Sequence, residues 1–500
     1  MLFKSTRGSS KRITAQEAII KGLADDGGLY VPEMIPKIDG DFLSGLLPLN
    51  YQKTALKVMK LFLDDFSEEE LERCIDAAYN TDSFDCDEIV PFHQLDSDTF
   101  VMELYHGPTC AFKDMALQLL PSVLVKSLEK TENKQQVAIL VATSGDTGKA
   151  ALEGFADVAG TKILVFYPEN GVSQVQKLQM TTQRGSNVAV SSVAGNFDDA
   201  QTGVKEIFRD KEIEKKLFSE GIILSSANSI NWGRLMPQIV YYFWAYTRLV
   251  SDGAVKLGDK INFSVPTGNF GNILAGWYAK KMGLPIHKLI CASNKNNVLS
   301  DFIQTGEYNR NREFHTTMSP SMDILISSNL ERFLYELSDN DAVLIGQWMD
   351  TLKDIGTYNI GETKREKMAD EFYGDYATEE QTQDEIRCVF NENGYLMDTH
   401  TAVAMRVYNE YRKSAGETVK TVVVSTASPY KFVKDVFEAV TCGKAKEDEF
   451  TLITELEKIS GTKIPKPLAG LQDLPQRHLT NTTKQNMKMT AESLLLNLPN

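Results

Sequence analysis

Residues 137–155, VAILVATSGDTGKAALEGF, contain the pattern that decides the fold. The first seven residues are almost continuously apolar and rich in β-branched side chains, which is typical of a strand buried on both faces of a parallel sheet. A turn with two glycines follows, and then a stretch with the spacing of an amphipathic helix. This stretch therefore predicts one strand–turn–helix unit of an α/β protein.

The same unit recurs on both sides of this stretch. The other strand-like runs are KILVFYP (162–168), NVAVSSV (187–193), GIILSSA (221–227), INFSVP (261–266), KLICASN (288–294) and VVVSTA (422–427). Strands that alternate with helices in this way predict parallel sheets covered by helices on both faces. Because a long helical stretch, NWGRLMPQIVYYFWAYTRLV (231–250), separates the first four strands from the others, we expect two α/β units.

The remaining chain is assigned around these two units. Ser67 and Glu70 form a capping box that opens one of several helices expected in the N-terminal region. Residues 362–387 hold nine acidic and four basic residues, which indicates a solvated helical insertion. The expected domains are a mainly helical N-terminal domain (1–92), a large α/β domain (93–114 and 229–500) and a small α/β domain (115–228).

Composition narrows the class of protein. Hydrophobic residues make up 42% and charged residues 24% of the 500, as in an ordinary globular chain with a large core. The formal net charge of −15 argues against a nucleic-acid partner, which would need a cationic surface. Small anionic ligands would need a local cluster of donors to overcome this background.

The cysteines, histidines and apolar runs exclude further classes. None of the six cysteines forms a C-x-x-C pair and the six histidines are scattered, so we expect no metal site. The longest apolar-rich run, QIVYYFWAYTRLV, is too short to span a membrane and carries an arginine. Since the N-terminus also lacks the apolar segment of a signal peptide, we expect a cytoplasmic protein with no membrane partner.

Three strand-to-helix junctions are candidate ligand sites, because open parallel sheets bind ligands at the carboxyl ends of their strands. In VATSGDTG (141–148), glycines, hydroxyls and a helix N-terminus suit a carboxylate or a phosphate, although the spacing is not that of a Walker A loop. A capping turn without a ligand is the alternative, and the motif alone does not decide between them.

The second junction is SVPTGNFGNILAG (264–276). Its glycines have the spacing G-x-x-G and not the G-x-G-x-x-G of a dinucleotide site. The pattern favours a single phosphate bound by backbone N–H groups at a helix N-terminus, with a tight packing turn as the alternative.

The third junction, HGPTCAFKDMALQLLP (106–121), places Lys113 at the start of an amphipathic helix. A buried amine there could form a Schiff base, because desolvation lowers the pKa of a lysine. Spacing alone favours an ordinary solvent-exposed lysine, and we expect His106 to be structural.

Taken together and in this order, these motifs resemble the threonine synthase family, which comprises pyridoxal 5'-phosphate enzymes of fold type II. The resemblance covers nearly the whole chain. The chain is similar to the longer version of the family, which is found in fungi and many bacteria. Its motifs are STRG (5–8), DGGLYVPE (26–33), GPTCAFKD (107–114), ATSGDTGKAA (142–151), FDDAQ (197–201), NSINWGRL (228–235), PTGNFGNILAG (266–276), SPSMDILISSNLERFL (319–334) and STASPYKF (425–432). The resemblance implies two parallel-sheet domains with the cofactor between them.

The resemblance also implies roles for particular residues. Lys113 corresponds to the lysine that forms the Schiff base, Thr426 to the hydroxyl residue facing the pyridine nitrogen, and Arg234 to an arginine that reaches the substrate phosphate. The residues implied to bind the cofactor phosphate are Gly268, Asn269, Phe270, Gly271 and Asn272. Those implied to bind the substrate α-carboxylate are Thr143, Ser144, Gly145, Asp146 and Thr147. The family's usual T-A-H-P-A-K-F reads T-A-S-P-Y-K-F here, so this loop offers no histidine as a base.

The reaction implied is the conversion of O-phospho-L-homoserine and water to L-threonine and phosphate, the last step of threonine biosynthesis. Lys113, once displaced from the cofactor, would take the α-proton of this small-molecule substrate. The alternatives are a threonine/serine dehydratase-like lyase, a non-catalytic binding protein of the same family, and a phosphatase-type relative. Monomer and homodimer both remain open.

Overall fold

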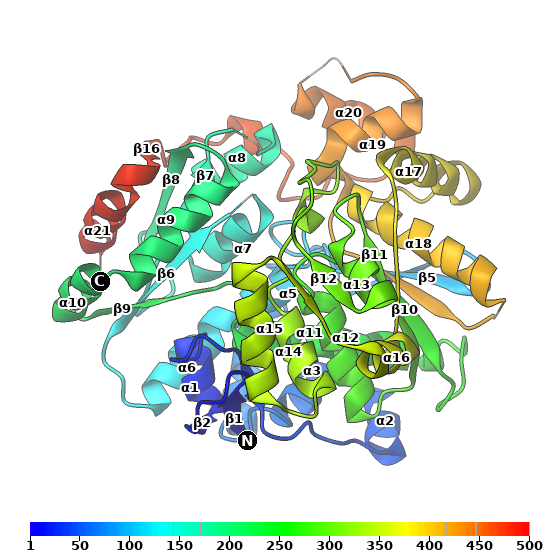
Figure 1. Cartoon of the computed structure of the whole chain (residues 1–500). Coiled ribbons are helices and arrows are strands. Elements are labelled where there is room, and N and C mark those ends of the chain that lie inside the picture. The colour runs from blue at the N-terminus through cyan, green and yellow to red at the C-terminus, as the bar shows by residue number, and fades with distance from the viewer. Residues whose placement is uncertain (144, 171, 417, 446–447, 500) are drawn as a thin grey trace.

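Two parallel sheets form the framework of the protein in a computed structural model that describes residues 1–143, 145–170, 172–416, 418–445 and 448–499 (Figure 1). Within these residues, one sheet has five strands in the order β16-β8-β7-β6-β9 and the other has six in the order β14-β11-β10-β15-β5-β4. The pairings are parallel except for β4, which runs antiparallel to β5. This confirms the α/β fold, and each of the seven strand-like runs contains a strand.

The five-stranded sheet is built from short buried strands with helices on both faces. Its strands are β6 (Gln136–Ala142), β7 (Thr161–Pro168), β8 (Val188–Ala194), β9 (Ile222–Ser225) and β16 (Thr480–Thr483). Its helices are α7 (Asp146–Phe155), α8 (Gln174–Thr181), α9 (Phe197–Arg209), α10 (Lys211–Ser219) and α21 (Met487–Asn497).

The six-stranded sheet carries the longer helices. Its strands are β4 (Phe92–Gln94), β5 (Thr99–Glu103), β10 (Ile261–Pro266), β11 (Ile286–Ser293), β14 (Phe372–Tyr376) and β15 (Thr421–Ser425). The helices around it and its insertions are α5 (Asp114–Leu117), α6 (Leu120–Lys130), α11 (Trp232–Ser251), α12 (Gly271–Met282), α13 (Val298–Thr305), α14 (Leu330–Leu337), α15 (Ala342–Asp354), α16 (Glu362–Glu371), α17 (Glu379–Asn393), α18 (Thr399–Ala415), α19 (Val433–Thr441) and α20 (Glu449–Ser460). A small two-stranded antiparallel sheet pairs β12 (Glu307–Asn309) with β13 (Thr357–Asn359). The 3₁₀ turns of the described chain are η1 (Pro320–Met322), η2 (Pro429–Phe432), η3 (Leu471–Asp473) and η4 (Lys484–Asn486).

The N-terminal region contains a small sheet that helical spacing does not predict. Its elements are β1 (Leu2–Ser5), β2 (Ile13–Thr14), α1 (Ala15–Lys21), β3 (Tyr30–Pro32), α2 (Gly40–Leu46), α3 (Tyr51–Lys60) and α4 (Glu68–Ala78). The strands are too short to show a period of two, and β1 pairs antiparallel with both β2 and β3. The expected capping box is present, because Ser67 accepts from the Glu70 N–H while the Glu70 carboxylate accepts from the Ser67 N–H.

The C-terminal segment lies on the five-stranded sheet. Residues 480–497, which the strand pattern assigns to the large domain, instead supply β16, which pairs with β8, and α21, which packs on α9 and β7 (Figure 1). Helix α21 buries Met487, Ala491 and Leu495, a stripe at spacing i, i+4, i+8 that covers one face of this sheet. The burial of this stripe provides the physical reason for the crossing.

The acid-rich segment 362–387 also differs from its expected all-helical form. Its residues Phe372–Tyr376 form β14, an edge strand that pairs in parallel with β11. Phe372 is buried and its ring packs against those of Phe270 and Phe333, so contact with the core stabilises a strand between α16 and α17.

Helix α11 forms the centre of the core. It is predominantly apolar and almost entirely buried, packing against α3, α5 and α12. The N-terminal region is fixed to this helix by Phe3, whose ring lies 5.2 Å from that of Trp232, and by Val90, whose carbonyl accepts from the Trp244 indole at 2.9 Å. Of the helices that the structure describes, none is long and apolar enough to cross a membrane.

Candidate active site

Lys113 is the residue around which the candidate site is built. It directly precedes α5 and is buried, with only 9% of its surface exposed, so the exposed lysine that spacing alone favours is not found. The end of β15 positions it: the Thr426 carbonyl accepts from the Phe112 N–H at 2.8 Å, and Ala111 forms an isolated bridge with Ala427. The Lys113 amine also lies 4.8 Å from the centre of the Phe112 ring.

The Lys113 amine has two polar partners. It donates to Asp146 Oδ2 and to Ser321 Oγ, at 3.3 Å each. Burial lowers the pKa of Lys113, opposed by the nearby Asp146 carboxylate and reinforced by the positive charges of Lys431 and Arg234. A lysine with a lowered pKa is more readily deprotonated and can therefore act as a nucleophile and a base.

Asp146, the first residue of α7, is a second charged centre of the site. Its Oδ1 lies 2.7 Å from the amine of Lys431 and accepts from Gln176 Nε2 at 3.0 Å. Burial alone would raise the pKa of Asp146, but Lys431 and Lys113 hold it well below its ordinary value. Because this side chain is an anion between two lysines, it is not itself a carboxylate ligand, and only its backbone could take the implied role.

The turn before α7 depends on Thr143 and two glycines. Thr143 Oγ1 accepts from the N–H groups of Gly145 at 3.0 Å and Gly148 at 2.8 Å. Gly145 has φ of +140°, a conformation that strains any residue with a side chain, and a Cβ there would also displace the Gln176 amide, which would lie 2.5 Å away. Thr143 therefore closes the turn with its lone pairs.

The remaining residues of this turn include Thr147, which is half-buried in the first turn of α7. First-turn N–H groups have no acceptor inside their own helix, so they are available to an anion. Ser144, which the resemblance also places here, lies outside the described residues.

The glycine loop before α12 has the features of a phosphate site. Phe270 takes a left-handed conformation with φ of +62° and precedes the first turn of the helix, which begins at Gly271. The Gly268 carbonyl accepts from Ser327 Oγ at 2.9 Å, and the Asn269 carbonyl accepts from the Asn329 N–H at 3.1 Å. The loop is therefore held from outside by the segment before α14.

Two amide nitrogens at this loop are buried and unpaired within the described residues. Tyr241 and Tyr242 donate to Asn272 Oδ1 at 2.7 and 2.8 Å, while Asn272 Nδ2 has no partner. Asn329 Nδ2 is unpaired too, and it lies 3.4 Å from where a Cβ on Gly271 would be. Because buried donors are nearly always satisfied, two orphaned donors beside a helix N-terminus fit a bound phosphate group.

Arg234, in the first turn of α11, is a buried cation. It is 5% exposed, and its Nη1 donates to the Ala227 carbonyl at 2.7 Å. Burial lowers the pKa of Arg234 to about 10, and the described residues supply no carboxylate to pair with it. A buried arginine without a carboxylate partner suits an anionic ligand. Lys149 in α7 is also buried, but it is ion-paired with Glu153 at 2.6 Å.

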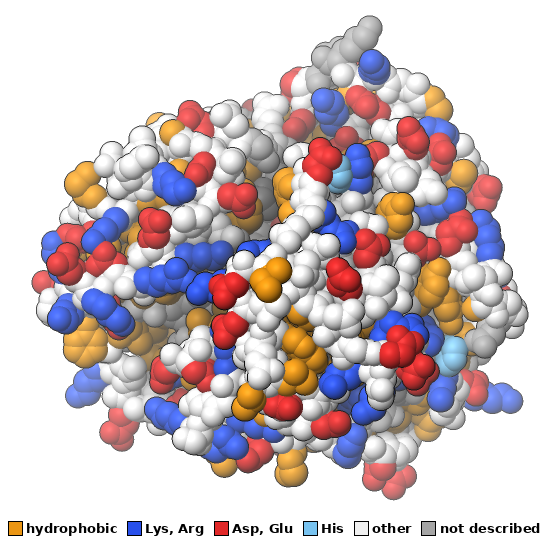
Figure 2. All heavy atoms as spheres, in the orientation of Figure 1, with side chains coloured by type: hydrophobic (Ala, Val, Ile, Leu, Met, Phe, Trp, Pro, Cys, Tyr) orange, Lys and Arg blue, Asp and Glu red, His pale blue; other side chains and the backbone are white. Residues whose placement is uncertain are grey.

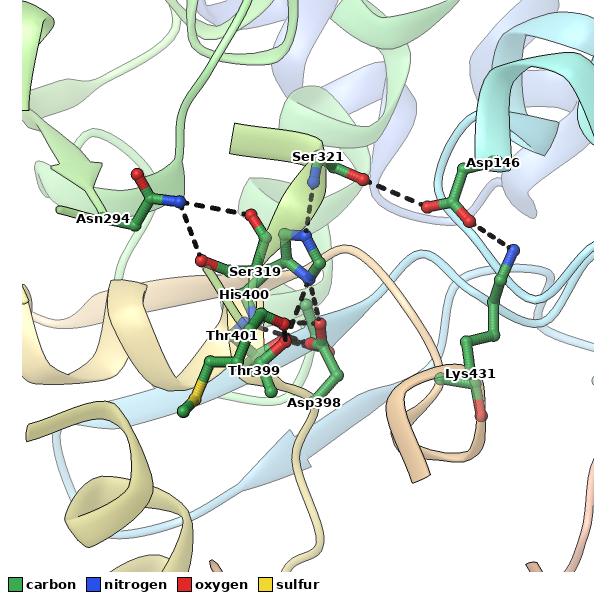
Figure 3. Close-up of polar contacts among 12 residues, drawn as sticks. Asp146, Asn294, Ser319, Ser321, Asp398, Thr399, His400, Thr401 and Lys431 are labelled. Atoms are coloured by element: carbon green, nitrogen blue, oxygen red, sulfur yellow. Dashed lines mark hydrogen bonds and ion pairs between the residues drawn. The ribbon is translucent and has the colours of Figure 1, made fainter. Parts of the chain in front are cut away.

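The structure adds residues that sequence reasoning did not assign to the site, namely Ser321, Asn329, His400 and Lys431. Three of them lie within the motifs SPSMDILISSNLERFL and STASPYKF, which were the available signal, whereas His400 lies outside every motif singled out. Figure 3 shows Ser321 between Asp146 and the histidine, with Lys431 on the far side of Asp146. Figure 2 shows lysine and arginine side chains, in blue, at the hollow between the part of the molecule built on the five-stranded sheet and the part built on the six-stranded sheet.

Two parallel sheets, a buried lysine at their strand ends and a glycine loop with unpaired donors define a class, the pyridoxal-phosphate-dependent enzymes of fold type II. The family model "Pyridoxal-phosphate dependent enzyme" matches residues 76–427, which agrees with this class. The models "Threonine synthase N terminus" and "Threonine synthase, C-terminal" match residues 2–79 and 401–490. The chain belongs to the threonine synthase family, and the resemblance drawn from the motifs is confirmed.

Individual relatives are similar over nearly the whole chain. Threonine synthase from Pseudomonas aeruginosa is 38% identical, over 96% of this chain and 98% of that protein. The crystal structure of PLP-bound threonine synthase from Brucella melitensis has a TM-score of 0.88 at 37% identity and covers 100% of both chains, and that of yeast has 0.89 at 33% and covers 99% of both. Human threonine synthase-like 1 is 40% identical over 95% of this chain, which spans 63% of the human protein's length.

Proposed function

We propose that the protein is a threonine synthase that converts O-phospho-L-homoserine and water to L-threonine and phosphate with pyridoxal 5'-phosphate as cofactor. The proposal is supported by similarity to curated threonine synthases from Pseudomonas aeruginosa and yeast, the latter 36% identical over 92% of this chain. The single observation that carries it is that a buried lysine has near it both a glycine loop with unpaired buried amides and a buried arginine without a carboxylate partner among the described residues.

The first anion site is the glycine loop before α12. Its first-turn N–H groups and the orphaned amides of Asn272 and Asn329 would hold the cofactor phosphate. Lys113 would attach the cofactor, and Thr426, 5% exposed at the end of β15, would present its hydroxyl to the pyridine nitrogen. When bound, pyridoxal phosphate supplies an electron sink for negative charge at the substrate α-carbon.

The second anion site is Arg234. A substrate that carries a phosphate at Cγ would satisfy this buried guanidinium, whose planar donors match phosphate oxygens in pairs. The first turn of α7, with the N–H groups of Asp146 and Thr147, would hold the substrate carboxylate. These contacts orient the substrate with its α-carbon toward the lysine.

Lys113 is then the group that moves the proton. With a pKa lowered by burial, the free amine can accept the proton at the substrate α-carbon and return one later. Asp146, held between Lys113 and Lys431, would stabilise the charge that the amine gains when it takes this proton.

The test of this proposal is a joint measurement of phosphate release and threonine formation from O-phospho-L-homoserine by the cofactor-loaded protein. Equal amounts of both, lost in Lys113→Ala, are expected. Phosphate without threonine would indicate a phosphatase-type enzyme, and neither product would indicate a non-catalytic binding protein. Turnover of threonine or serine, supplied as alternative substrates, with no phosphate released from O-phospho-L-homoserine would indicate a dehydratase.

The cellular compartment of the protein and the class of its partner are proposed on separate grounds. The six cysteines are unpaired, including Cys388 and Cys442 at the surface, as is usual in a reducing compartment such as the cytoplasm. The net charge of −15 supports a small-molecule substrate as the partner and not a nucleic acid.

A further inference from the structure

Ser321, in the 3₁₀ turn η1, contacts both charged groups of the site. Its hydroxyl accepts from the Lys113 amine at 3.3 Å and lies 3.2 Å from Asp146 Oδ2, to which it donates. Its carbonyl packs on the cofactor loop, because a Cβ on Gly268 would lie only 2.9 Å from this oxygen. Residue 321 therefore touches the reactive amine, its counter-ion and the glycine loop.

A buried histidine holds the backbone of Ser321. The Ser321 N–H donates to His400 Nε2 at 3.2 Å, and His400 Nδ1 lies 2.7 Å from Asp398 Oδ2 (Figure 3). A carboxylate beside Nδ1 places the ring proton there, which leaves the lone pair on Nε2 as the acceptor that Ser321 requires. His400 and Asp398 are 2% and 0% exposed, so this arrangement is shielded from water.

The helix α18 fixes this pair in turn. Asp398 caps the helix, since its carboxylate accepts from the N–H groups of His400 at 2.9 Å and Thr401 at 3.0 Å. The Thr399 hydroxyl donates to the Met318 carbonyl at 2.7 Å, which ties the start of the helix to the segment that carries Ser321. The loop is thus held against α18 at two points.

We propose that Ser321 is a further catalytic residue, whose hydroxyl, together with Asp146, docks the amine of Lys113 whenever it is not attached to the cofactor, and that Asp398 and His400 are its positioning pair. Of the groups that face this amine, Asp146 attracts its charge and Lys431 and Arg234 repel it. Ser321 supplies a neutral acceptor that every protonation state of the amine can use. Only the effect of Ser321 on turnover rests on the proposed function.

The docking has a measurable consequence for the cofactor-free chain. Only the unprotonated amine attacks the aldehyde of pyridoxal phosphate, a step that forms one C–N bond and releases one water molecule. An acceptor hydroxyl stabilises the ammonium form, so removing it should increase the unprotonated fraction at a given pH. Ser321→Ala should shift the midpoint of the pH–rate profile for cofactor capture downward by about one pH unit.

The experiment follows the rise in visible absorbance when pyridoxal phosphate is added to the cofactor-free full chain at a series of pH values. His400→Phe keeps the ring volume but removes the acceptor, and it should give the same shift as Ser321→Ala. His400→Gln can present an amide oxygen to the Ser321 N–H and should restore the wild-type midpoint. A role confined to loop stability would change the melting temperature without moving this midpoint.

The matched control is Ser319→Ala in the same loop. The Ser319 hydroxyl lies 3.0 Å from Asn294 Nδ2, and that amide also reaches the Ser319 carbonyl at 3.2 Å, so the loop stays anchored without the hydroxyl. This variant should keep the wild-type midpoint. An unshifted midpoint in Ser321→Ala overturns the catalytic role, and a shift in His400→Phe that His400→Gln does not reverse overturns the positioning role. If His400→Phe does not fold, Ser321→Ala still tests the catalytic role. A comparison of His400→Gln with His400→Ala then tests the positioning role.

Failure of the proposed function would be seen separately, as absent turnover of O-phospho-L-homoserine by wild type. Where turnover is present, Ser321→Ala should lower kcat more than it raises KM, because the hydroxyl contacts Lys113 and not the second anion site. An equal kcat with a raised KM would place Ser321 in substrate binding and overturn the proposal.

Discussion

Arg234→Met should give a protein that is at least as stable as wild type in the absence of substrate but is severely impaired in turnover. The change removes the buried guanidinium and keeps most of its aliphatic volume. Arg234 is 5% exposed and has no carboxylate partner among the described residues, so its charge destabilises the free protein.

The magnitude follows from the pKa of Arg234 and from its hydrogen bond to the Ala227 carbonyl. Burial lowers the pKa of Arg234 from 12.5 to about 10, which corresponds to about 3 kcal/mol of destabilisation of the charged form. Losing the bond to the Ala227 carbonyl offsets about 1.5–3 kcal/mol of this. The net change in unfolding free energy is therefore about 0–2 kcal/mol in favour of Arg234→Met.

The effect on catalysis should be much larger and of opposite sign. Two charge-assisted bonds to the substrate phosphate, at about 1.5–3 kcal/mol each, predict a loss in kcat/KM of about 10²- to 10⁴-fold. Cofactor loading, read from visible absorbance, should be unchanged because the proposed cofactor phosphate site lies in the loop before α12.

The assay combines thermal unfolding with steady-state kinetics. Inorganic phosphate should raise the melting temperature of wild type by binding the native state, and it should have less effect on Arg234→Met. A variant that melts several degrees lower than wild type but keeps its kcat/KM would refute the reasoning, since Arg234 would then be a structural residue.

Four further outcomes are expected. Lys113→Ala should lose the visible absorbance of the loaded protein, and cofactor that stays covalently attached to this variant after borohydride reduction and dialysis would mean that another lysine carries it. Gly268→Ala should weaken cofactor affinity by about 10-fold or more, because its Cβ would meet backbone atoms of the η1 turn at 2.9 and 3.1 Å; an affinity equal to that of wild type, measured by absorbance titration, contradicts this. Thr426→Val should alter the spectrum and slow threonine formation while Thr426→Ser does not, and a fully active Thr426→Val would reduce residue 426 to a packing role. Two carboxylates pair with His106 and raise its pKa from 6.5 to about 9, although burial opposes this. His106 should therefore stabilise the fold fully below pH 6.5 and progressively less as pH rises through 9. The difference in melting temperature between wild type and His106→Gln should shrink over that window.

The sequence alone determined the α/β class, seven of the strands in the two large sheets and the positions of the three strand-end motifs. Strands buried on both faces leave little room for polar residues, so runs such as VAILVAT are readable without any tertiary information. The glycine spacing favoured a single-phosphate loop over a dinucleotide site, and this signal also lies within a few consecutive residues. The N-terminal strands and β14 were not readable, because they are too short to show a period and depend on packing.

Tertiary structure decided which residues form the site and in what electrostatic state. Lys113 meets Asp146 across 33 positions and Ser321 across 208, and Ser321 meets His400 across 79. No local pattern encodes such contacts, because they arise only when strand ends of two sheets and a 3₁₀ turn come together. Burial of Lys113 and the pairing of Asp146 with Lys431 follow from that packing, as does the lack of a carboxylate beside Arg234 among the described residues. These features set the charges on which the chemistry depends.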